Sequence, residues 1–548
     1  MDRLETLKGL RERFNLQIED ERHEFIRQLH PLVRYWIGAV PNHRDIFREG
    51  DIKILLNVMF TLEGYRLLKN LQKSELIDFL ASTGYKDEPD VGEDGKPLLR
   101  RATVVHRAAR CVNSFVYPIR GLFQIFNRFD ANYVNEKGVT HFHIACQYGC
   151  DDVVEKFLDL GKVDPNACPM PRTVNSPLHL ALQYEGHLGV AALLLSRGAD
   201  PNSTNHEGST PLHFVTQNHT DDTPEPLFRI IDELNLSVHI DAQDKLGWTP
   251  LHLAMHHRTK KKVESLLRRG ANPNLSIPRV SFTPLHVACM GNYDSIGLMK
   301  LFFVVNDELN QSVEVDARDK WGRTPLNYAV AKLFPHIADE LLDRGADLSD
   351  FVFPAEKDFD QFHKILVECD YRFKYNLVSR ALAVVDVLEK RGRELCQSEA
   401  LIVMKFFTEL GLFEKSGHLE LNWYEDEEFA SKAKKVMVKA DLSLYDLMRL
   451  RPREVEKLCM YTDFWKFFML GSAKSVQRWK RLTVESREAC VMHLCDKMSR
   501  RFFRDWALES FLELIHYRLP ILCCEMIIDN LTNQDLCNIC LAALVQSS

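Results

Sequence analysis

The stretch Thr249-Pro250-Leu251-His252 decides the fold, because the chain repeats it with variation on both sides. The other copies are Ser176-Pro177-Leu178-His179, Thr210-Pro211-Leu212-His213, Thr283-Pro284-Leu285-His286 and the weaker Thr103-Val104-Val105-His106, Thr140-His141-Phe142-His143 and Thr324-Pro325-Leu326-Asn327. The fourth position of each copy falls at 106, 143, 179, 213, 252, 286 and 327, so successive copies lie 34 to 41 residues apart. A period in this range indicates an architecture of stacked repeats.

Each copy has the features of the start of a short helix. Ser or Thr suits the N-cap, and Pro suits the first helical position because its missing N–H leaves no hydrogen bond unmade there. A Gly shortly before the phrase, as at Gly247 and Gly322, predicts a tight turn with positive φ. A second helix carries apolar pairs such as Leu266-Leu267 and ends at Gly270, a left-handed stop. The sequence therefore predicts helix pairs joined by projecting turns.

These residues resemble the ankyrin repeat over residues 99–350, with about six recognisable repeats and one degraded first copy. The resemblance implies helix pairs with projecting hairpins that stack into a solenoid, because a single unit cannot bury its own apolar face. We therefore expect an all-α fold, an ankyrin-repeat solenoid flanked by N- and C-terminal helical regions. The expected domains are an N-terminal helical region (1–98), the solenoid (99–350), a helical connector (351–458) and a C-terminal helical domain (459–548).

The recurring histidines could be metal ligands, or they could bond backbone groups between repeats, as the resemblance implies. We expect the structural role, because each histidine keeps its place in the repeat and none has a Cys or carboxylate at ligand spacing. Cys537-Asn538-Ile539-Cys540 is a lone CxxC. Cys523 and Cys524 upstream are adjacent and would point to different sides of a helix, which favours core thiols over zinc. We expect no metal and no cofactor.

Composition and charge narrow the function classes. The net charge of −7 gives no electrostatic footprint for nucleic acid. No apolar run approaches the ~18 residues that span a membrane, so we expect no membrane-spanning segment. Met1-Asp2-Arg3 is charged from its second residue, so we expect no secretory signal peptide. Fourteen scattered Cys suit a reducing compartment, the cytoplasm, with the nucleus left open. No catalytic constellation is apparent, so we expect no enzyme.

The C-terminal end carries a second pattern. Leu519-Pro520 is followed by Ile527-Ile528, then Leu531, then Asp535-Leu536. Pro520 suits a helix start, and Cys523, Ile527, Ile528 and Leu531 recur at helical spacing, so we expect them to share one face. Residues 532–535 suit a turn and N-cap before a second short helix over 536–544.

This spacing resembles the beginning of an F-box, and an ankyrin array with a truncated F-box-like tail resembles the layout of the PRANC proteins. The resemblance implies docking on the small adaptor subunit of a cullin–RING ubiquitin ligase. The docking residues it implies are Leu519, Pro520, Ile527, Ile528, Leu531 and Leu536. The chain departs from the F-box pattern at Leu522 and Cys523, where Glu and Leu are usual. The alternative is a capping helix pair that shields the end of the solenoid.

In the ankyrin family, partners lie along the concave side and contact hairpin tips and exposed residues of the first helices. The residues that the resemblance places there are Trp321, Lys320, Leu246, His206, Tyr148, Tyr184, His256 and Tyr293. Trp321 is the strongest candidate for partner contact, because an aromatic at an exposed tip has no evident structural task and Trp anchors dominate many interfaces. The alternative is an ordinary exposed aromatic.

The sequence thus predicts a protein-binding adaptor. Its ankyrin repeats would recruit a target protein, and its F-box-like helices would dock on a cullin–RING ubiquitin ligase. The alternative is a non-catalytic ankyrin scaffold or sequestering protein whose C-terminal helices only cap the solenoid.

Overall fold

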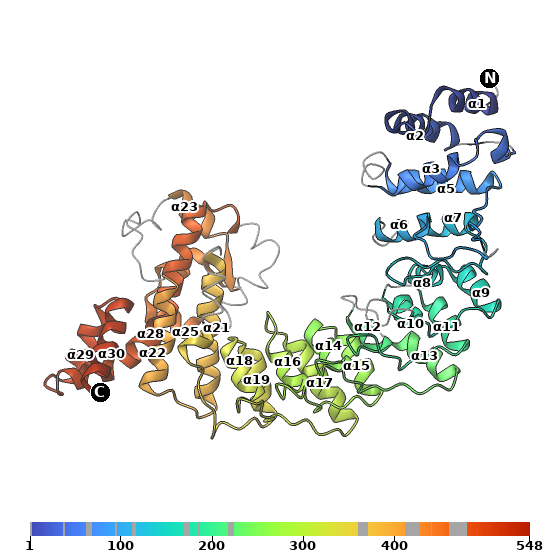
Figure 1. The fold of residues 1–548 in the computed structure, drawn as a ribbon. Coiled ribbons are helices and arrows are strands. Elements are labelled where there is room, and N and C mark those ends of the chain that lie inside the picture. The colour runs from blue at the N-terminus through green and yellow to red at the C-terminus, as the bar shows by residue number, and fades with distance from the viewer. Residues whose placement is uncertain are drawn as a thin grey trace. The chain divides into compact units, whose positions relative to one another are not determined.

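The computed structural model describes residues 3–34, 36, 39–61, 68–93, 96–111, 117–168, 175–183, 187–217, 224–359, 371–411, 427–439, 441–459 and 479–547. Packing contacts divide the chain into two compact units, Met1–Arg279 and Val280–Ser548. Helices dominate both units (Figure 1), and the described part of the chain contains one small antiparallel sheet, β1 (Met437–Lys439) with β2 (Leu442–Ser443). The expected all-α ankyrin-repeat solenoid is confirmed.

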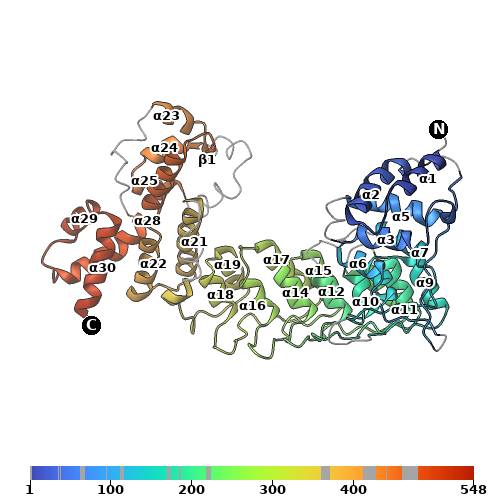
Figure 2. The same cartoon turned by 45° about the horizontal axis from the view of Figure 1, so that its top comes forward.

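The first unit consists of short helices in successive pairs (Figures 1 and 2). Its N-terminal helices are α1 (Arg3–Arg13), α2 (Glu19–Val33), the 3-10 helix η1 (His43–Asp45), α3 (Asp51–Met59) and α5 (Asn70–Ser82). The repeat helices are α6 (Val104–Cys111), α7 (Tyr117–Ile125), α8 (His141–Gln147), α9 (Asp151–Asp159), α10 (Pro177–Leu182), α11 (Leu188–Ser196), α12 (Pro211–Gln217), α13 (Glu225–Glu233), α14 (Pro250–His257) and α15 (Lys260–Arg268).

The pairs of the first unit stack in two rows. One row runs through α6, α8, α10, α12 and α14, and the other contains α9, α11 and α13. Upstream, α5 packs on α7, α3 and α2, so the array begins before the first copy of the repeated phrase. Leu7, Phe25 and Leu29 are buried in these N-terminal helices, which therefore share the core of the unit.

The second unit begins with two further repeat pairs, α16 (Pro284–Cys289) with α17 (Ile296–Glu308) and α18 (Pro325–Ala331) with α19 (Pro335–Asp343). Its remaining helices are α21 (Tyr371–Lys390), α22 (Gln397–Glu409), α23 (Glu427–Ala433), α24 (Leu444–Arg449), α25 (Pro452–Leu458), α28 (Val484–Leu514), α29 (Ile521–Asp529) and α30 (Asn533–Ser547). Helix α21 packs on α19, α28 packs on α21, and α30 packs on both α28 and α22. The repeats and the C-terminal helices of this unit thus form one continuous packing chain.

The Thr and His of the repeated phrase are joined within each repeat. In the copy at Thr249, the backbone N–H of Thr249 donates to His252 Nδ1 at 3.2 Å, and the Thr249 hydroxyl lies 2.7 Å from the same nitrogen. Both residues are buried. Because Nδ1 accepts a backbone hydrogen bond, the proton of the neutral ring belongs on Nε2.

The Nε2 atoms then link one repeat to the next. His106 Nε2 lies 2.9 Å from the carbonyl of Val139, and His179 Nε2 lies 2.9 Å from that of Ser209, each acceptor being the residue before the next N-cap. The same bond recurs at His213 and His286, whereas His143 Nε2 lies 2.9 Å from the carbonyl of Ala167, between α9 and α10. The expectation that these histidines bond backbone groups between repeats is confirmed.

The last copy of the phrase has Asn in place of His and keeps the same connections. Asn327 Oδ1 accepts from the backbone N–H of Thr324 at 2.8 Å, and Asn327 Nδ2 donates to the carbonyl of Val352 at 2.9 Å. The position therefore requires one acceptor and one donor at fixed places, and a neutral imidazole or an amide can supply both.

Burial keeps the histidines neutral. It lowers the pKa of His106, His143 and His179 to about 4, and it also lowers the pKa of His213 and His286. An unfolded chain protonates its histidines near pH 6.5, so between pH 6.5 and 4 the unfolded state binds more protons than the folded state. The free energy of unfolding therefore falls as the pH is lowered through this window.

Replacing one histidine by asparagine tests this linkage. His143→Asn retains an acceptor and a donor, as Asn327 does, but removes one group whose pKa is lower in the folded state than in the unfolded state. Between pH 6 and 4.5, the loss of unfolding free energy should be smaller in the variant by up to about 1.4 kcal/mol per pH unit. Urea unfolding followed by circular dichroism at each pH measures this difference, and identical pH slopes for the two proteins would contradict it.

Ion pairs add a second link between neighbouring repeats. Arg269, after α15, pairs with Asp232 of α13, and Arg344, after α19, pairs with Asp307 of α17. Arg391 follows α21 and pairs with Asp343 of α19 at 2.6 Å, so α21 continues the register of the second repeat helices.

One buried arginine joins α21 to the last repeat. Arg380 Nε donates to the carbonyl of Leu333 at 2.6 Å, and Arg380 Nη2 donates to that of Lys332 at 2.7 Å, both at the end of α18. The guanidinium lies 4.9 Å from the ring of Phe334. Burial lowers the pKa of Arg380 to about 10, so the group remains charged at neutral pH.

Arg380→Leu should therefore destabilise the second unit more than the loss of an exposed ion pair does. It leaves the Leu333 and Lys332 carbonyls without this donor, at a cost of roughly 2–4 kcal/mol in unfolding free energy. The matched control, Arg391→Leu, removes an exposed pair and should cost less than about 1 kcal/mol. Urea unfolding of both variants tests the contrast, which equal losses would refute.

Candidate protein-binding surfaces

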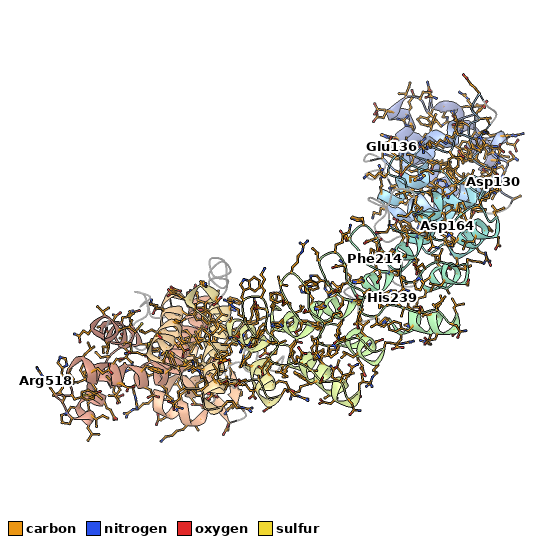
Figure 3. All side chains as sticks on the ribbon, turned by 60° about the horizontal axis from the view of Figure 1, so that its bottom comes forward. Asp130, Glu136, Asp164, Phe214, His239 and Arg518 are labelled. Carbon is orange, nitrogen blue, oxygen red and sulfur yellow. The ribbon has the colours of Figure 1, made fainter. Side chains whose placement is uncertain are left out.

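Four hairpin tips share one turn. In each, an Asn or Asp side chain accepts hydrogen bonds from the backbone N–H groups two and four residues later, and a Gly with positive φ follows three residues after it. The acceptors are Asn135, Asn205, Asp244 and Asp319. The two residues between acceptor and Gly are exposed at every one of these tips; Glu136 is the example labelled in Figure 3. The fixed turn thus presents two side chains per repeat.

The tip at Asp319 presents Lys320 and Trp321. Trp321 is 58% exposed, and its ring lies 5.9 Å from the ring of Phe282 and 4.5 Å from Lys320 Nζ. Below it, the Tyr328 hydroxyl donates to Asp319 Oδ2 at 2.7 Å, and burial raises the pKa of Tyr328, which keeps this donor protonated. The indole therefore lies on a braced turn with much of its surface open to solvent.

Two tips of the first unit lie next to each other. His206 and Leu246 are exposed, and the backbone N–H of Lys245 donates to the carbonyl of Glu207 at 2.8 Å, which joins the tips. A Cβ on Gly247 would lie 2.5 Å from Pro278 Cδ, so this turn excludes larger residues. His206 and Leu246 accordingly form part of one surface.

The ends of the first helices contribute further exposed rings. His256, at the end of α14, is exposed, and its ring lies 5.5 Å from that of Trp248. Tyr293, in the turn after α16, is 56% exposed, and Met290 beside it is also exposed. Phe214, labelled in Figure 3, lies on α12 with its ring 5.0 Å from that of His179.

The expectation that Tyr148 is exposed is wrong. Tyr148 is buried, and its hydroxyl donates to the carbonyl of Ala109 in α6 at 2.8 Å. The chain turns at Gly149, with φ of +61°, directly after α8, and the tyrosine packs against the preceding repeat. Tyr184 lies outside the described residues. The remaining exposed positions are His206, Leu246 and His256 in the first unit and Lys320, Trp321 and Tyr293 in the second.

The second candidate surface is the exposed side of α29. Leu519, Pro520 and Ile527 are exposed, as docking residues must be. Ile521, Leu522 and Met526 are exposed with them at 53%, 68% and 69%. These six residues are called the α29 patch below. Arg518, labelled in Figure 3, lies in the loop that precedes it.

The expectation that Cys523, Ile527, Ile528 and Leu531 share one helix face is wrong. Ile528 and Cys524 are fully buried, whereas Cys523 and Ile527 are exposed, so these residues do not share one face. Apolar residues occupy nearly every position of this nine-residue helix, and its sequence pattern therefore cannot determine which side packs. Leu536 is also fully buried, and Leu531 is half-buried, so they support the helices from within.

Polar side chains of α28 hold α29 and α30. Arg500 Nη2 donates to the carbonyl of Ile528 at 2.7 Å, and Arg500 Nη1 donates to Asn533 Oδ1 at 3.1 Å. Asn533 Nδ2 donates to the carbonyl of Asp496 at 3.0 Å. The patch is consequently carried by a helix that is anchored at its C-terminal end.

The cysteines of α29 and α30 differ in exposure. Cys523 is exposed and Cys524 buried, which places them on different sides of α29 as expected, and Cys537 and Cys540 are buried. Across the described ranges, no three His, Cys, Asp or Glu side chains gather as metal ligands would. Within the same ranges, no helix combines the length and hydropathy of a bilayer-crossing segment.

Sequence reasoning missed half of the α29 patch. Ile521, Leu522 and Met526 lie between the residues that the F-box spacing singles out. A signal was present, because apolar residues fill both the 521–522 and 526–527 positions and only Glu525 and Asp529 of this helix are charged.

Comparison with known proteins agrees with the repeat assignment. A family model described as ankyrin repeats (3 copies) matches residues 105–205, 178–277 and 223–302. The chain is 30% identical over 174 residues to transient receptor potential cation channel subfamily A member 1 of Drosophila melanogaster, which is 31% of this chain and 14% of the relative. It is 32% identical over 144 residues to the B-cell lymphoma 3 protein homolog of Mus musculus, 26% of this chain and 30% of the relative. The chain thus spans less than a third of either protein.

A solved structure gives a further likeness. The ankyrin repeat domain of Bcl-3 aligns with a TM-score of 0.35 at 23% identity, over 42% of this chain and all of that one. The family match and the repeated hydrogen-bond geometry together identify residues 105–302 as ankyrin repeats.

Proposed function

We propose that the chain is a non-catalytic adaptor. Its ankyrin repeats bind a target protein through the exposed tip residues, and its α29 patch docks on the adaptor subunit of a cullin–RING ubiquitin ligase. Ankyrin repeats imply protein–protein interaction, and the proposal adds a ligase subunit as the second partner.

The observation that carries the ligase step is the apolar outer side of α29. A capping helix must present a polar outer face, because it ends a hydrophobic core in water. Ile521, Leu522 and Met526 are instead more than half exposed, although Cys524 and Ile528 already anchor the helix. Contiguous exposed apolar side chains are typical of interaction sites. This favours docking over capping.

The F-box-like spacing supports the choice of partner. Leu519-Pro520 and Ile527 belong to that spacing and are exposed, while Ile528 and Leu536 are in the core and support α29 and α30. In the proposed assembly, binding the target beside the ligase makes ubiquitin transfer effectively intramolecular, which raises the effective concentration of the target.

The scaffold alternative shares the target-binding half of the proposal. It differs only at α29, where a cap would contribute stability and bind no ligase subunit. Variants of the tips therefore test target binding alone, and variants of the α29 patch decide between the two functions.

Trp321→Ala tests the tip surface. An exposed indole that anchors an interface should cost about 2 kcal/mol or more in target affinity when truncated, which weakens binding at least tenfold. The target is first identified by mass spectrometry of proteins that co-purify with the full chain, and its affinity is then measured by calorimetry.

Val304→Ala is the matched control for the tip variant. Val304 is 45% exposed on α17 and lies away from the tips in the repeat, so this change should leave target affinity unaltered. If wild type and Trp321→Ala bind the target with equal affinity, Trp321 is not part of the target-binding surface.

Two changes in α29 separate docking from capping. Leu522→Asp alters an exposed residue near the helix N-terminus, where a carboxylate is tolerated, and should reduce binding to the purified ligase adaptor at least tenfold with little change in stability. Ile528→Ala alters a fully buried residue and should cost about 2–5 kcal/mol of unfolding free energy.

Val545→Asp is the control for an exposed apolar residue of α30 outside the patch. It should bind the adaptor as wild type does in pull-down and calorimetry. If neither the wild type nor any variant binds the adaptor, the proposed docking on the ligase is refuted and the scaffold alternative remains.

A further inference from the structure

The first unit contains a cationic cavity outside the surfaces described above. A cavity of about 650 Å³ lies between η1, the N-terminus of α3 and the segment after α5. Four cationic side chains line it, namely Arg44, Arg48, Lys53 and Lys86. Two carboxylates, Glu49 and Glu88, line it as well. The cavity therefore has an excess of two positive charges in a chain whose net charge is −7.

The cationic side chains of the cavity form fewer close ion pairs than the arginines that link the repeats. Arg269 and Arg344 each pair with an Asp of the preceding repeat. Within the described residues, Arg44 and Arg48 form no ion pair, and Lys53 has its nearest carboxylate oxygen, of Asp90, at 3.9 Å. Lys86 Nζ donates to the backbone carbonyl of Gln124 at 2.6 Å. Their charge is consequently available to an incoming anion.

The floor of the cavity is apolar. Phe47 and Ile52 are buried there, and the half-buried ring of Tyr85 packs edge-on against His43 at 5.5 Å. Burial raises the pKa of Tyr85 to about 12, so its hydroxyl adds no negative charge at neutral pH. An apolar floor within a cationic rim suits a ligand that is partly apolar and partly anionic.

The start of α3 adds to the positive field. Gly50 is the N-cap, with φ of +85°, and has no side chain, while the first-turn carboxylate of Asp51 is buried and paired with Arg11. The positive end of the helix dipole thus lies at the same cavity as Arg48 and Lys53. A second cavity of about 200 Å³ shares Lys53 and Tyr85 and is also lined by Arg107 and by Arg101, which pairs with Asp87 at 3.0 Å.

We propose that this cavity binds an acidic segment of a partner protein, with an apolar side chain on Phe47 and Tyr85 and flanking carboxylates on Arg44, Arg48, Lys53 and Lys86. Charge complementarity selects this occupant. A nucleic-acid backbone fits less well, because an excess of only two positive charges releases few counterions.

The test uses the full chain and a fluorescein-labelled dodecapeptide of Glu and Asp around one central Phe. Fluorescence anisotropy in 50 mM NaCl should give saturable binding. Arg44→Glu/Arg48→Glu should weaken it at least tenfold, and the neutral Arg44→Gln/Arg48→Gln should weaken it less. A peptide with Ser in place of Phe should bind several-fold more weakly. Circular dichroism confirms that each variant is folded.

Lys260→Glu/Lys261→Glu is the matched control, because it reverses two exposed charges of α15 in the same unit. This variant should bind the peptide within twofold of wild type. Absence of saturable binding, equal weakening by both charge reversals, or stronger binding of single-stranded DNA of equal charge would overturn the proposal. None of these outcomes depends on the α29 patch, so the result is independent of the ligase step.

Discussion

The fold depends on one hydrogen-bond relay, from the N-cap Thr through a buried imidazole to the backbone of the next repeat. The Thr249 N–H fixes the proton of His252 on Nε2, and at His106 and His179 the Nε2 atom meets a carbonyl before the following N-cap. Each bond therefore satisfies a buried backbone group and sets the position of the neighbouring helix. Because the relay needs a neutral ring, the same burial that makes it strong links the array to pH.

Much of the repeat architecture could be predicted from the sequence, because its signals are local. The N-cap, the Pro after it and the Gly stops each follow from backbone chemistry at one position, and the Thr103 copy shows the Thr–His pair even without Pro. The beginning of the array could not be predicted in this way. Helix α5 packs on α7 as a repeat helix does, but its segment lacks the phrase and is recognised only from tertiary contacts.

The candidate surfaces also differ in how far the sequence predicts which residues are exposed. Exposure of Trp321 and Leu246 follows from a turn whose residues are visible in the sequence. Tyr148 lies at the end of a first helix, where exposure was expected, yet it is buried because the preceding repeat offers a carbonyl within reach of its hydroxyl. In α29 apolar residues occur on all sides, so only packing on α28 reveals that Ile528 faces inward and Ile527 outward.

The shared tip turn also bears on how such a protein changes over time. Asp319 and Gly322 determine the backbone of the tip, and neither Lys320 nor Trp321 takes part in that geometry through its side chain. The residues that build the frame and the residues that face a partner are therefore separate. Substitutions between the two fixed positions can alter what the surface recognises while the stack keeps its stability, which makes specificity free to diverge faster than architecture.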